Sequence, residues 1–229
     1  MPKAKTPRRT GYHHGNLREA LIEAALQLVK EGGPESVSVR EAAKRAGVSP
    51  GAPFRHFNNK TALMTAVAEQ AMGQFRAEIT KAVENVTSDD PIKRFAAIGV
   101  AYLRWAFQNP TQFQIISTRS LIDWDGSESL RRDNDAVRSL LEESMVEAQR
   151  RSMLRSDNIA DTQIAARALV YGLARMHIDG HFAQWAAPGV TGEQTAHNVL
   201  KHFVTLVEND GSKTAKKVKV TQKRPLVRR

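Results

Sequence analysis

Histidine pairs are the residues whose spacing could support metal chemistry in this chain. His177 and His181 are four positions apart, a spacing that places two imidazoles on one face of a helix. His13 and His14 are adjacent near the start of the chain. Neither pair has an evident third ligand, Gly180 weakens the helix at the later pair, and the chain contains no Cys. No recognisable nucleophile–base pair is present either, so we expect no catalytic residue, no metal and no cofactor.

Basic residues are the other candidates for chemistry, because they gather at particular places. The formal net charge is +10. Residues 1–14 carry four Lys or Arg and no acid, and residues 210–229 carry eight Lys or Arg and one Asp. The residues between are nearly neutral, mildly positive over 15–60 and mildly negative over 61–209. This distribution is typical of a nucleic-acid-binding end joined to a neutral body, although basic tails can also serve only solubility or non-specific binding.

Helical periodicity dominates the elements that would position these residues. Apolar residues recur at three- and four-residue steps, and no stretch alternates convincingly with a period of two. No run of about 18 apolar residues could span a membrane. We therefore predict an all-α, cytoplasmic protein with two helical domains. The predicted parts are a disordered basic arm (1–14), a first domain (15–75), a second domain (76–208) and a disordered basic tail (209–229).

The first domain opens with an amphipathic helix predicted over about 16–30. Ser38 then begins a short helix, with Glu41 at the spacing of a capping box. After a turn at Gly47, Ser49 is predicted to cap a second short helix, with Pro50 in its first position.

A long helix over about 60–85, capped by Asn58 or Asn59, follows the two short ones. Phe54 and Phe57 are predicted to point into the core. The later helices are predicted over about 91–108, around 115–116, and over 128–154, 158–184 and 192–208. The buried side of the long helix is predicted to comprise Leu63, Met64, Val67, Ala71, Phe75 and Ile79.

Residues 38–57 read SVREAAKRAGVSPGAPFRHF, with two short capped helices around a glycine turn. This arrangement is a helix-turn-helix. Its first helix braces the second against the DNA backbone, and the second presents its N-terminal residues to base edges in the major groove. The small side chains of Ser49, Pro50, Gly51 and Ala52 would allow a close approach.

This stretch resembles the DNA-binding domain of the TetR family, whose motif runs Ser-x-Gly-x-apolar-Tyr-x-His-Phe followed by x-x-Lys-x-x-Leu. The matching residues are Ser49, Gly51, His56, Phe57, Lys60 and Leu63. Two positions depart from the motif, since Phe54 replaces Tyr and Pro53 replaces an aliphatic residue. Pro53 lacks an N–H to bond back to the Ser49 carbonyl, so we expect a short helix with a tight first turn.

The resemblance implies a DNA site in which some residues contact phosphates and others read bases. Phosphate contacts would come from Ser38, Arg40, His56 and Lys60. Base readout would fall to Pro50, Gly51, Ala52 and Arg55, with Ser49 at the start of the helix. Because Pro50 and Pro53 lie so close together, readout by the small side chains would be limited, and apolar contacts to thymine methyls and DNA shape would contribute more. The N-terminal arm, with Arg8, Arg9, Tyr12, His13 and His14, would either reach an adjacent minor groove or phosphates, or remain unbound.

Residues 91–208 resemble the ligand-binding and dimerisation half of the same family. Segments 101–123 and 168–180 resemble a subgroup with a Trp-His-Gly signature, although Arg167 and Tyr171 replace its Trp and His. We predict an effector pocket among these helices, the alternative being that its aromatic residues form ordinary core. The predicted pocket residues are Tyr102, Trp105, Arg167, Tyr171 and His177.

The last two predicted helices carry apolar stripes that the resemblance assigns to a homodimer interface. The predicted interface residues are Ile164, Ala168, Val199, Leu200, Phe203 and Val207. A two-fold dimer predicts a near-palindromic double-stranded operator. We therefore expect a repressor that responds to an unknown small molecule. The alternatives are a general DNA-coating protein that acts through its basic tails and, less favoured, a helical metal-dependent enzyme.

Overall fold

A computed structural model describes residues 17–209, and the predicted arm (1–14) and tail (209–229), apart from Asn209, lie outside these residues. Eight α-helices and no β-strand occur in the described part, which confirms the all-α prediction. None of its helices is both long enough and apolar enough to cross a bilayer. The described residues divide into two compact units, of which the first comprises residues 17–71 and 111–127 and the second comprises residues 72–110 and 128–209.

The first unit is built on α1 (Leu17–Gly32), α2 (Val39–Arg45) and the beginning of α3 (Lys60–Glu84). It also contains α5 (Pro110–Ser117), apart from its first residue, and short 3-10 helices at Pro34–Ser36 (η1), Ala52–Arg55 (η2) and Arg119–Leu121 (η3). The largest wholly buried side chains of its core are Leu21, Leu63, Met64, Val67, Phe113 and Ile115.

Segment 111–127 is attached to the first half of α3 by two polar contacts. The Asp123 backbone N–H donates to the Thr65 hydroxyl at 2.9 Å, and the Ser127 hydroxyl donates to Glu69 at 2.8 Å. Thr65 and Ser127 are both buried, so these bonds also satisfy polar groups removed from water. The contacts explain why a segment predicted to belong with the second domain groups with the first unit.

Local capping groups begin several helices where the sequence predicted them. Ser38 Oγ accepts from the Glu41 N–H at 3.0 Å, and Asp90 Oδ1 accepts from the Ile92 N–H at 2.8 Å. Asn59, and not Asn58, caps α3, because its Oδ1 accepts from the Ala62 N–H at 2.8 Å. All six side chains predicted for the buried side of α3 are at most 4% exposed.

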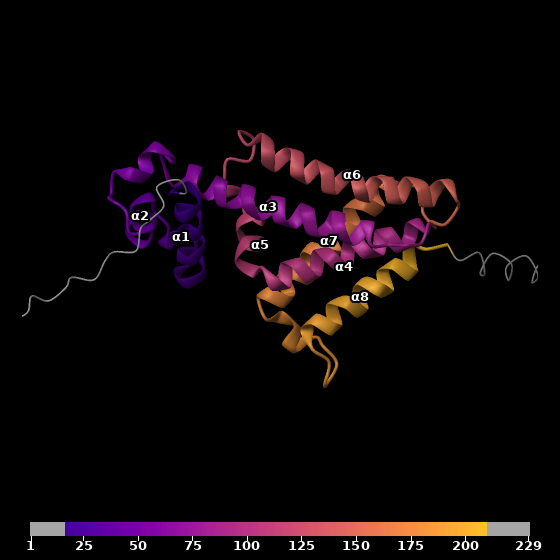
Figure 1. Cartoon of the computed structure of the whole chain (residues 1–229). Coiled ribbons are helices and arrows are strands. Elements are labelled where there is room, and N and C mark those ends of the chain that lie inside the picture. Colours follow the sequence, from indigo (N-terminus) through magenta and orange to yellow (C-terminus); the bar gives the residue numbers. More distant parts are fainter. Residues whose placement is uncertain (1–16, 210–229) are drawn as a thin grey trace, which may run out of the picture. The chain divides into compact units, whose positions relative to one another are not determined.

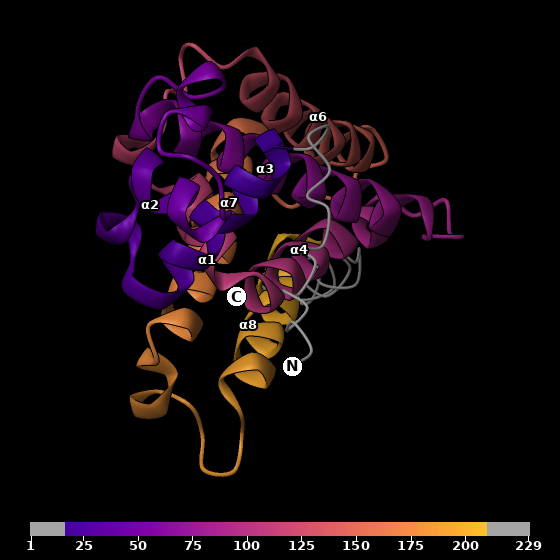
Figure 2. The same cartoon turned by 60° about the vertical axis from the view of Figure 1, so that its left-hand side comes forward.

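The second unit has α4 (Pro91–Gln108) as its central helix. In Figure 1 and Figure 2, α4 lies among α6 (Glu128–Arg150), α7 (Ile159–Ile178) and α8 (Gly192–Val207), and it contacts each of them. One core cluster gathers side chains from α4, α6 and α7 together with Leu154, and Phe203 and Val207 of α8 pack against it. The second unit is therefore a helical bundle around α4.

Two helices of the second unit end earlier than predicted. α6 ends at Arg150, not near 154, because Ser152 adopts a φ of 57° and Leu154 pairs with Glu208 in an isolated bridge. α7 ends at Ile178, not near 184, because Gly180 adopts the left-handed φ of 75°. A separate 3-10 helix, η4 (His181–Gln184), follows it.

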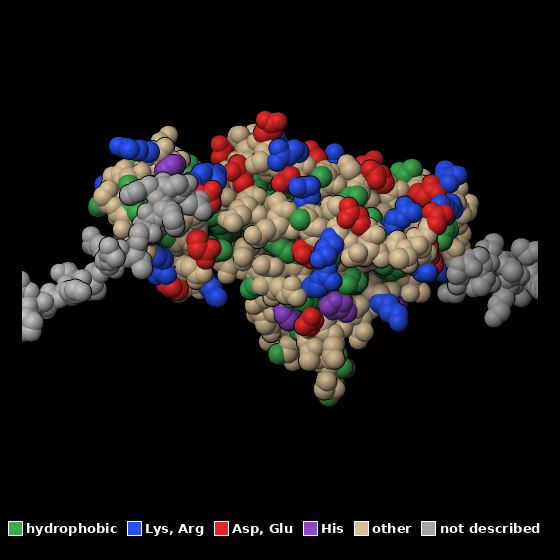
Figure 3. Space-filling view, viewed as in Figure 1, with side chains coloured by type: hydrophobic (Ala, Val, Ile, Leu, Met, Phe, Trp, Pro, Cys, Tyr) green, Lys and Arg blue, Asp and Glu red, His purple; other side chains and the backbone are tan. Residues whose placement is uncertain are grey.

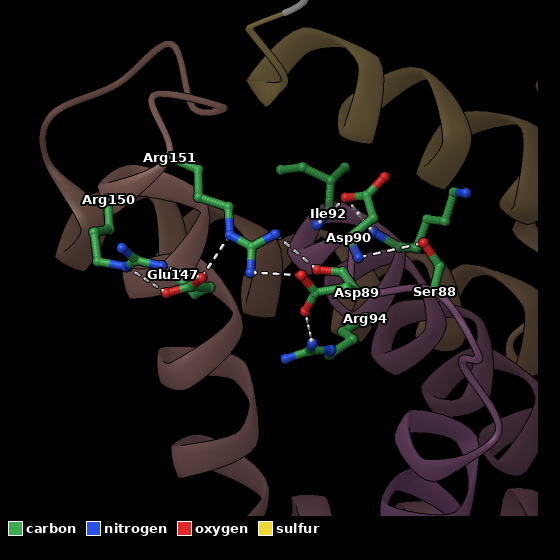
Figure 4. Close-up of polar contacts among 9 residues, drawn as sticks. Ser88, Asp89, Asp90, Ile92, Arg94, Glu147, Arg150 and Arg151 are labelled. Carbon is green, nitrogen blue, oxygen red and sulfur yellow. Dashed lines mark hydrogen bonds and ion pairs between the residues drawn. The ribbon is translucent and has the colours of Figure 1, made fainter.

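An ion-pair network joins the end of α6 to the loop before α4 (Figure 4). Arg151 contacts Asp89 Oδ2 at 3.0 Å and also pairs with Glu147, which accepts from Arg150 Nη2 at 2.7 Å. Hydrogen bonds from Arg150 and Arg151 lower the pKa of Glu147 to about 2. Arg94, on α4, pairs with the same Asp89 at 3.2 Å. The network thus links the end of α6 to the start of α4, the central helix of the bundle.

Candidate functional site

The segment after α2 forms an exposed turn, which we call the tip (residues 49–56). Gly47, with a φ of 69°, reverses the chain before it. The tip contains only the single-turn helix η2, so the prediction that Ser49 caps a helix with Pro50 in its first position is wrong. Pro53 cannot donate to the Ser49 carbonyl, and the Ala52 N–H donates to it at 3.1 Å, which closes a tighter turn.

Two buried residues fasten the tip to the first unit. Pro53 is almost completely buried and Phe57 is 3% exposed, and the Phe57 N–H donates to the Pro53 carbonyl at 2.9 Å. Residues four apart share one face of a helical turn, whereas Phe54 points away from that face. Phe54 is 44% exposed, so the prediction that it points into the core is wrong.

Most of the predicted base-reading residues lie on the exposed side of the tip. Ser49, Pro50, Gly51, Arg55 and His56 are exposed, and Ala52 is half-buried. None of the side chains from 50 to 54 carries a hydrogen-bond donor. Residues 50–54 therefore present a small apolar surface, with the exposed side chains of Arg55 and His56 beside it. The sequence did not predict that Phe54 belongs to this surface.

Three of the four predicted phosphate-contacting residues lie at the starts of α2 and α3, and the fourth, His56, is exposed in the tip. The Ser38 hydroxyl accepts a capping bond, and Arg40 is exposed one position inside α2. Lys60 is the first residue of α3, and its Nζ lies 3.5 Å from Glu35 Oε2. The Glu35 side chain is 92% exposed, so water or another anion can replace it easily.

Two ion pairs hold the helices behind the tip. Arg45 of α2 donates from both terminal nitrogens to Glu31 of α1, a bidentate contact that lowers the pKa of the Glu31 carboxyl. Arg18 of α1 lies 5.7 Å from the centroid of the Phe57 ring and 3.6 Å from Glu69. These contacts position α2 and the tip on α1 and α3.

The second unit contains a cavity of about 330 Å³, which we call the pocket. Its walls come from α4, α6, α7 and α8. Three of these helices contribute residues at positions i, i+3, i+4 and i+7, so each presents one continuous face. The lining residues at this spacing are Phe95, Ile98, Gly99 and Tyr102 on α4, Asn134, Val137, Arg138 and Leu141 on α6, and Gln163, Ala166, Arg167 and Val170 on α7.

Leu200 and Phe203 of α8 and Ile164 of α7 complete the lining. Gly99 allows α8 to approach closely, because a Cβ at this position would lie 2.9 Å from Leu200 Cδ1. Most of the lining is apolar, and the volume falls in the range of small-molecule sites.

Two of the five predicted pocket residues line the pocket. Tyr102 is 6% exposed and Arg167 lies with its guanidinium carbon 5.5 Å from the centroid of the Tyr102 ring. Trp105 is instead core, 5.0 Å from Phe75 between ring centroids, and the His177 ring stacks on Phe107 at 4.0 Å. Tyr171 is 38% exposed and does not line the pocket.

Polar residues of the pocket were missed by the sequence reasoning. Gln163 lines the pocket, and its Nε2 is buried with no hydrogen-bond partner within residues 17–209. Asn134 and Arg138 also line it. Burial raises the pKa of Tyr102 to about 12, so its hydroxyl is neutral at physiological pH. The i, i+3, i+4, i+7 spacing on α6 and α7 was the signal that could have found them.

The predicted interface residues fall into two groups. Ile164 is 69% exposed, Val199 is 37% exposed and Ala168 is exposed. Leu200 is 4% exposed, and Phe203 and Val207 pack on the core cluster. These three residues therefore pack inside the single chain and are not available for an interface.

Further apolar residues extend the outward-facing stripes of the last two helices. On α7, Tyr171 follows Ile164 and Ala168 at helical spacing. On α8, Leu206 is 57% exposed and lies seven positions after Val199. Sequence reasoning missed Leu206.

The described residues show neither a metal cluster nor a one-sign surface on the face in view. No group of three His, Asp or Glu side chains within 17–209 is placed to hold a metal ion. On the face that Figure 3 shows, Lys and Arg side chains are interspersed with Asp and Glu over the second unit.

Two family models match the chain. Residues 21–67 match the model described as bacterial regulatory proteins, tetR family, and residues 95–203 match the model described as tetracyclin repressor-like, C-terminal domain. Together they cover more than half of the chain. Neither description names the Trp-His-Gly signature, so the subgroup stays a prediction.

Curated relatives show the same similarity. The chain is 46% identical to the class C tetracycline repressor protein of Escherichia coli over 52 residues, which are 23% of this chain and 24% of that protein. It is 31% identical to the HTH-type transcriptional regulator BetI of Rhizobium meliloti (strain 1021) over 35% of this chain and 39% of that protein. The chain thus spans less than half the length of these two relatives. A BetI of Escherichia coli O127:H6 is 26% identical over 82% of this chain and 92% of its own.

Solved structures share the fold. A protein of unknown function from Rhodococcus sp. RHA1 has a TM-score of 0.73 and 24% identity, and covers 88% of this chain and 100% of its own. The TetR-family regulator PfmR from Thermus thermophilus has a TM-score of 0.63 and 19% identity, over 82% of this chain and 99% of its own.

Proposed function

Because this chain belongs to the TetR family of DNA-binding transcriptional regulators, we propose that it is a repressor whose dimer binds a near-palindromic operator and releases it when a small molecule fills the pocket. The observation that carries the proposal is the tip, whose exposed side is held in place by the buried Pro53 and Phe57. The protein would act in the bacterial cytoplasm, where its operator lies. The family is one of regulators and not of enzymes.

The tip supports DNA binding because it can approach the floor of the major groove. Pro50, Gly51 and Ala52 have small side chains, so the backbone can come close to the base edges. Side chains 50–54 carry no donor, so their selectivity would come from apolar contacts with thymine methyl groups and from DNA shape, and the exposed Arg55 would add a donor for base edges. Phe54 enlarges this apolar surface.

The starts of α2 and α3 support phosphate contacts on either side of the tip. Arg40 and Lys60 supply positive charge there, and the first turn of a helix presents unpaired backbone N–H groups. A phosphate would replace Glu35 beside Lys60, exchanging one exposed ion pair for another. These contacts would fix the register on the duplex without reading sequence.

The exposed stripes of α7 and α8 support a two-fold dimer. Ile164, Ala168, Tyr171, Val199 and Leu206 are all exposed in the single chain and would be covered by the same residues of a second copy. A two-fold axis duplicates the tip, and this duplication is what a near-palindromic operator requires.

Coupling between pocket and DNA would run through Phe75 of α3. Its ring lies 5.2 Å from the ring of Tyr102 in an edge-on contact, and Tyr102 lines the pocket. A ligand against Tyr102 would therefore act on α3, the same continuous helix whose first residue is Lys60.

Selection of bound fragments from random duplex DNA tests the proposal. The expected result is a near-palindromic site with two half-sites in adjacent turns of the duplex. Recovery of fragments without a common sequence would instead support a DNA-coating protein, and the regulator proposal would fail. Deletion of residues 1–14 and 209–229 distinguishes these two hypotheses further. A DNA-coating protein would lose its DNA binding, whereas the regulator would keep its preference for the operator.

A further inference from the structure

We infer that the pocket takes a hydrophobic monocarboxylate, with its apolar part inside and its carboxylate at Arg167 and Gln163. The inference rests on the proposed function only in treating the pocket as the effector site. It specifies the chemical class of the effector, which the fold alone leaves open.

The apolar part of the ligand follows from the interior of the pocket. Phe95, Ile98 and Leu200 are each at most 6% exposed and line the cavity from α4 and α8. A polar group placed among them would lose water without gaining a hydrogen-bond partner. A hydrocarbon chain or an aromatic ring is the ligand chemistry that fits this end.

The negative charge of the ligand follows from the charged members of the lining. Arg138 and Arg167 both line the pocket, and no Asp or Glu is among the lining residues. Arg138 has Asp135 at 3.7 Å, whereas Arg167 has no carboxylate within ion-pair distance in residues 17–209. A cationic ligand would meet two like charges, and an anionic one would meet an unneutralised guanidinium.

The position of the head group follows from α7. Gln163 and Arg167 are four residues apart, so they lie on one face of the helix and one turn from each other. The Gln163 Nε2 has no partner in the described part of the chain, and a carboxylate oxygen would give it one. Arg167 is exposed, so the head group lies at the solvent side while the tail lies inward.

Tyr102 does not neutralise Arg167. The guanidinium lies over its ring, and the hydroxyl stays protonated at physiological pH because burial raises its pKa to about 12. The ring contact orients the guanidinium and leaves its charge uncompensated for a ligand.

Isothermal titration calorimetry of the full-length protein with small probes tests the class. The probes are octanoate, 3-phenylpropanoate, 1-octanol and octyltrimethylammonium, which separate charge from hydrophobic length. We expect at least one carboxylate to bind about tenfold tighter than both the alcohol and the cation. Equal or tighter binding of the cation or the alcohol would overturn the inference, as would no binding of either carboxylate.

Two variants test the residues. Arg167→Gln should weaken binding of the carboxylate about tenfold and leave binding of 1-octanol unchanged. Gln163→Leu should weaken binding of the carboxylate by a smaller factor. The matched control is Arg104→Gln, an exposed arginine on α4 that pairs with Glu78 and does not line the pocket. If Arg167→Gln and Arg104→Gln bind the carboxylate alike while both keep the wild-type melting temperature, the assignment is wrong.

Operator binding and carboxylate binding can be lost independently of each other. Carboxylate binding that depends on Arg167, in a protein with no preferred operator, would keep the ligand class and remove the repressor. A preferred operator together with no carboxylate binding would keep the repressor and remove the ligand class.

Discussion

Lys60 combines a positive charge with a position at the start of a helix, and both favour contact with a DNA phosphate. It begins α3, directly after the Asn59 cap, and its only ion-pair partner within residues 17–209 is the highly exposed Glu35. Exposed ion pairs of this kind are worth at most about 1 kcal/mol. Lys60 is therefore free to exchange a carboxylate for a phosphate at little cost.

Lys60→Ala should weaken binding to every DNA sequence by a similar factor. Loss of one phosphate contact should also reduce the slope of log K against log salt by about 1 for each subunit. Fluorescence anisotropy of labelled operator over a range of salt concentrations measures both. Lys81→Ala, an exposed lysine near the far end of the same helix, is the control and should change neither. An unchanged slope for Lys60→Ala would remove Lys60 from the DNA contact.

Phe54→Tyr tests the residue at which the chain departs from the family motif. Because Phe54 is 44% exposed, an added hydroxyl needs no burial and should leave the melting temperature unchanged. If the hydroxyl reaches a phosphate, operator binding should tighten by about 0.5–1.5 kcal/mol, with an unchanged salt slope because the group is neutral. Weaker binding after the change would show that the ring itself must remain apolar at the DNA surface.

Helix ends and helix faces differ in how far the sequence predicts them. The caps at Ser38, Asn59 and Asp90 depend on neighbours within three residues, so local spacing predicted the Ser38 cap and narrowed the cap of α3 to Asn58 or Asn59. Whether the Phe54 side chain is buried or exposed depends on whether the tip is an α-helix or a 3-10 turn. One missing N–H at Pro53 decides this, and helical periodicity cannot show it.

The residues that line the pocket were also only partly predictable from the sequence, because they depend on how the helices pack. Trp105 and His177 were aromatic candidates, but the crossing of α4 with its neighbours turns them towards Phe75 and Phe107. Polar Gln163 and Arg138 on amphipathic helices are usually solvent-facing, and only the tertiary arrangement brings them to a cavity. Leu200 was predicted for an interface because its apolar stripe covers more than one face of α8.

The close approach of α4 and α8 depends on Gly99. A Gly99→Val variant should displace Leu200, reduce the pocket and destabilise the protein by about 1–3 kcal/mol. Urea unfolding, followed by circular dichroism, measures the change. Gly172→Ala on α7 is the matched control, because an added Cβ there meets no atom within 4 Å, and the change should be neutral or stabilising by up to about 1 kcal/mol. Equal effects of the two variants would contradict the packing role of Gly99.

The network at the end of α6 should make stability depend on pH below neutrality. The pKa of Glu147 is lowered to about 2 from 4.5 by hydrogen bonds from Arg150 and Arg151. Its contribution is therefore complete above about pH 4.5 and is lost as pH falls towards 2. Melting temperatures at low ionic strength should fall less steeply over this range for Glu147→Gln than for Glu142→Gln, an exposed glutamate on the same helix outside the network. Parallel curves would exclude the network as the cause.

For the whole molecule, dimerisation should connect the stripes of α7 and α8 to operator affinity. Ala168→Glu places a charge on the exposed stripe without touching the pocket lining. It should give a monomer in analytical ultracentrifugation and a large loss of operator binding, because each half-site would then be bound independently. Val146→Glu, at an exposed apolar position on α6, should remain dimeric and bind normally. A dimeric Ala168→Glu protein would place the interface elsewhere.

The donor-free side chains of residues 50–54 have a consequence for DNA chemistry. A duplex with uracil in place of thymine keeps every phosphate and every Watson–Crick group but lacks the C5 methyl groups, so this protein should bind it less tightly than the thymine form. A 5-methylcytosine restores a methyl group at the equivalent place in the groove. The epigenetic state of the operator, and not only its base order, would then influence where the protein binds.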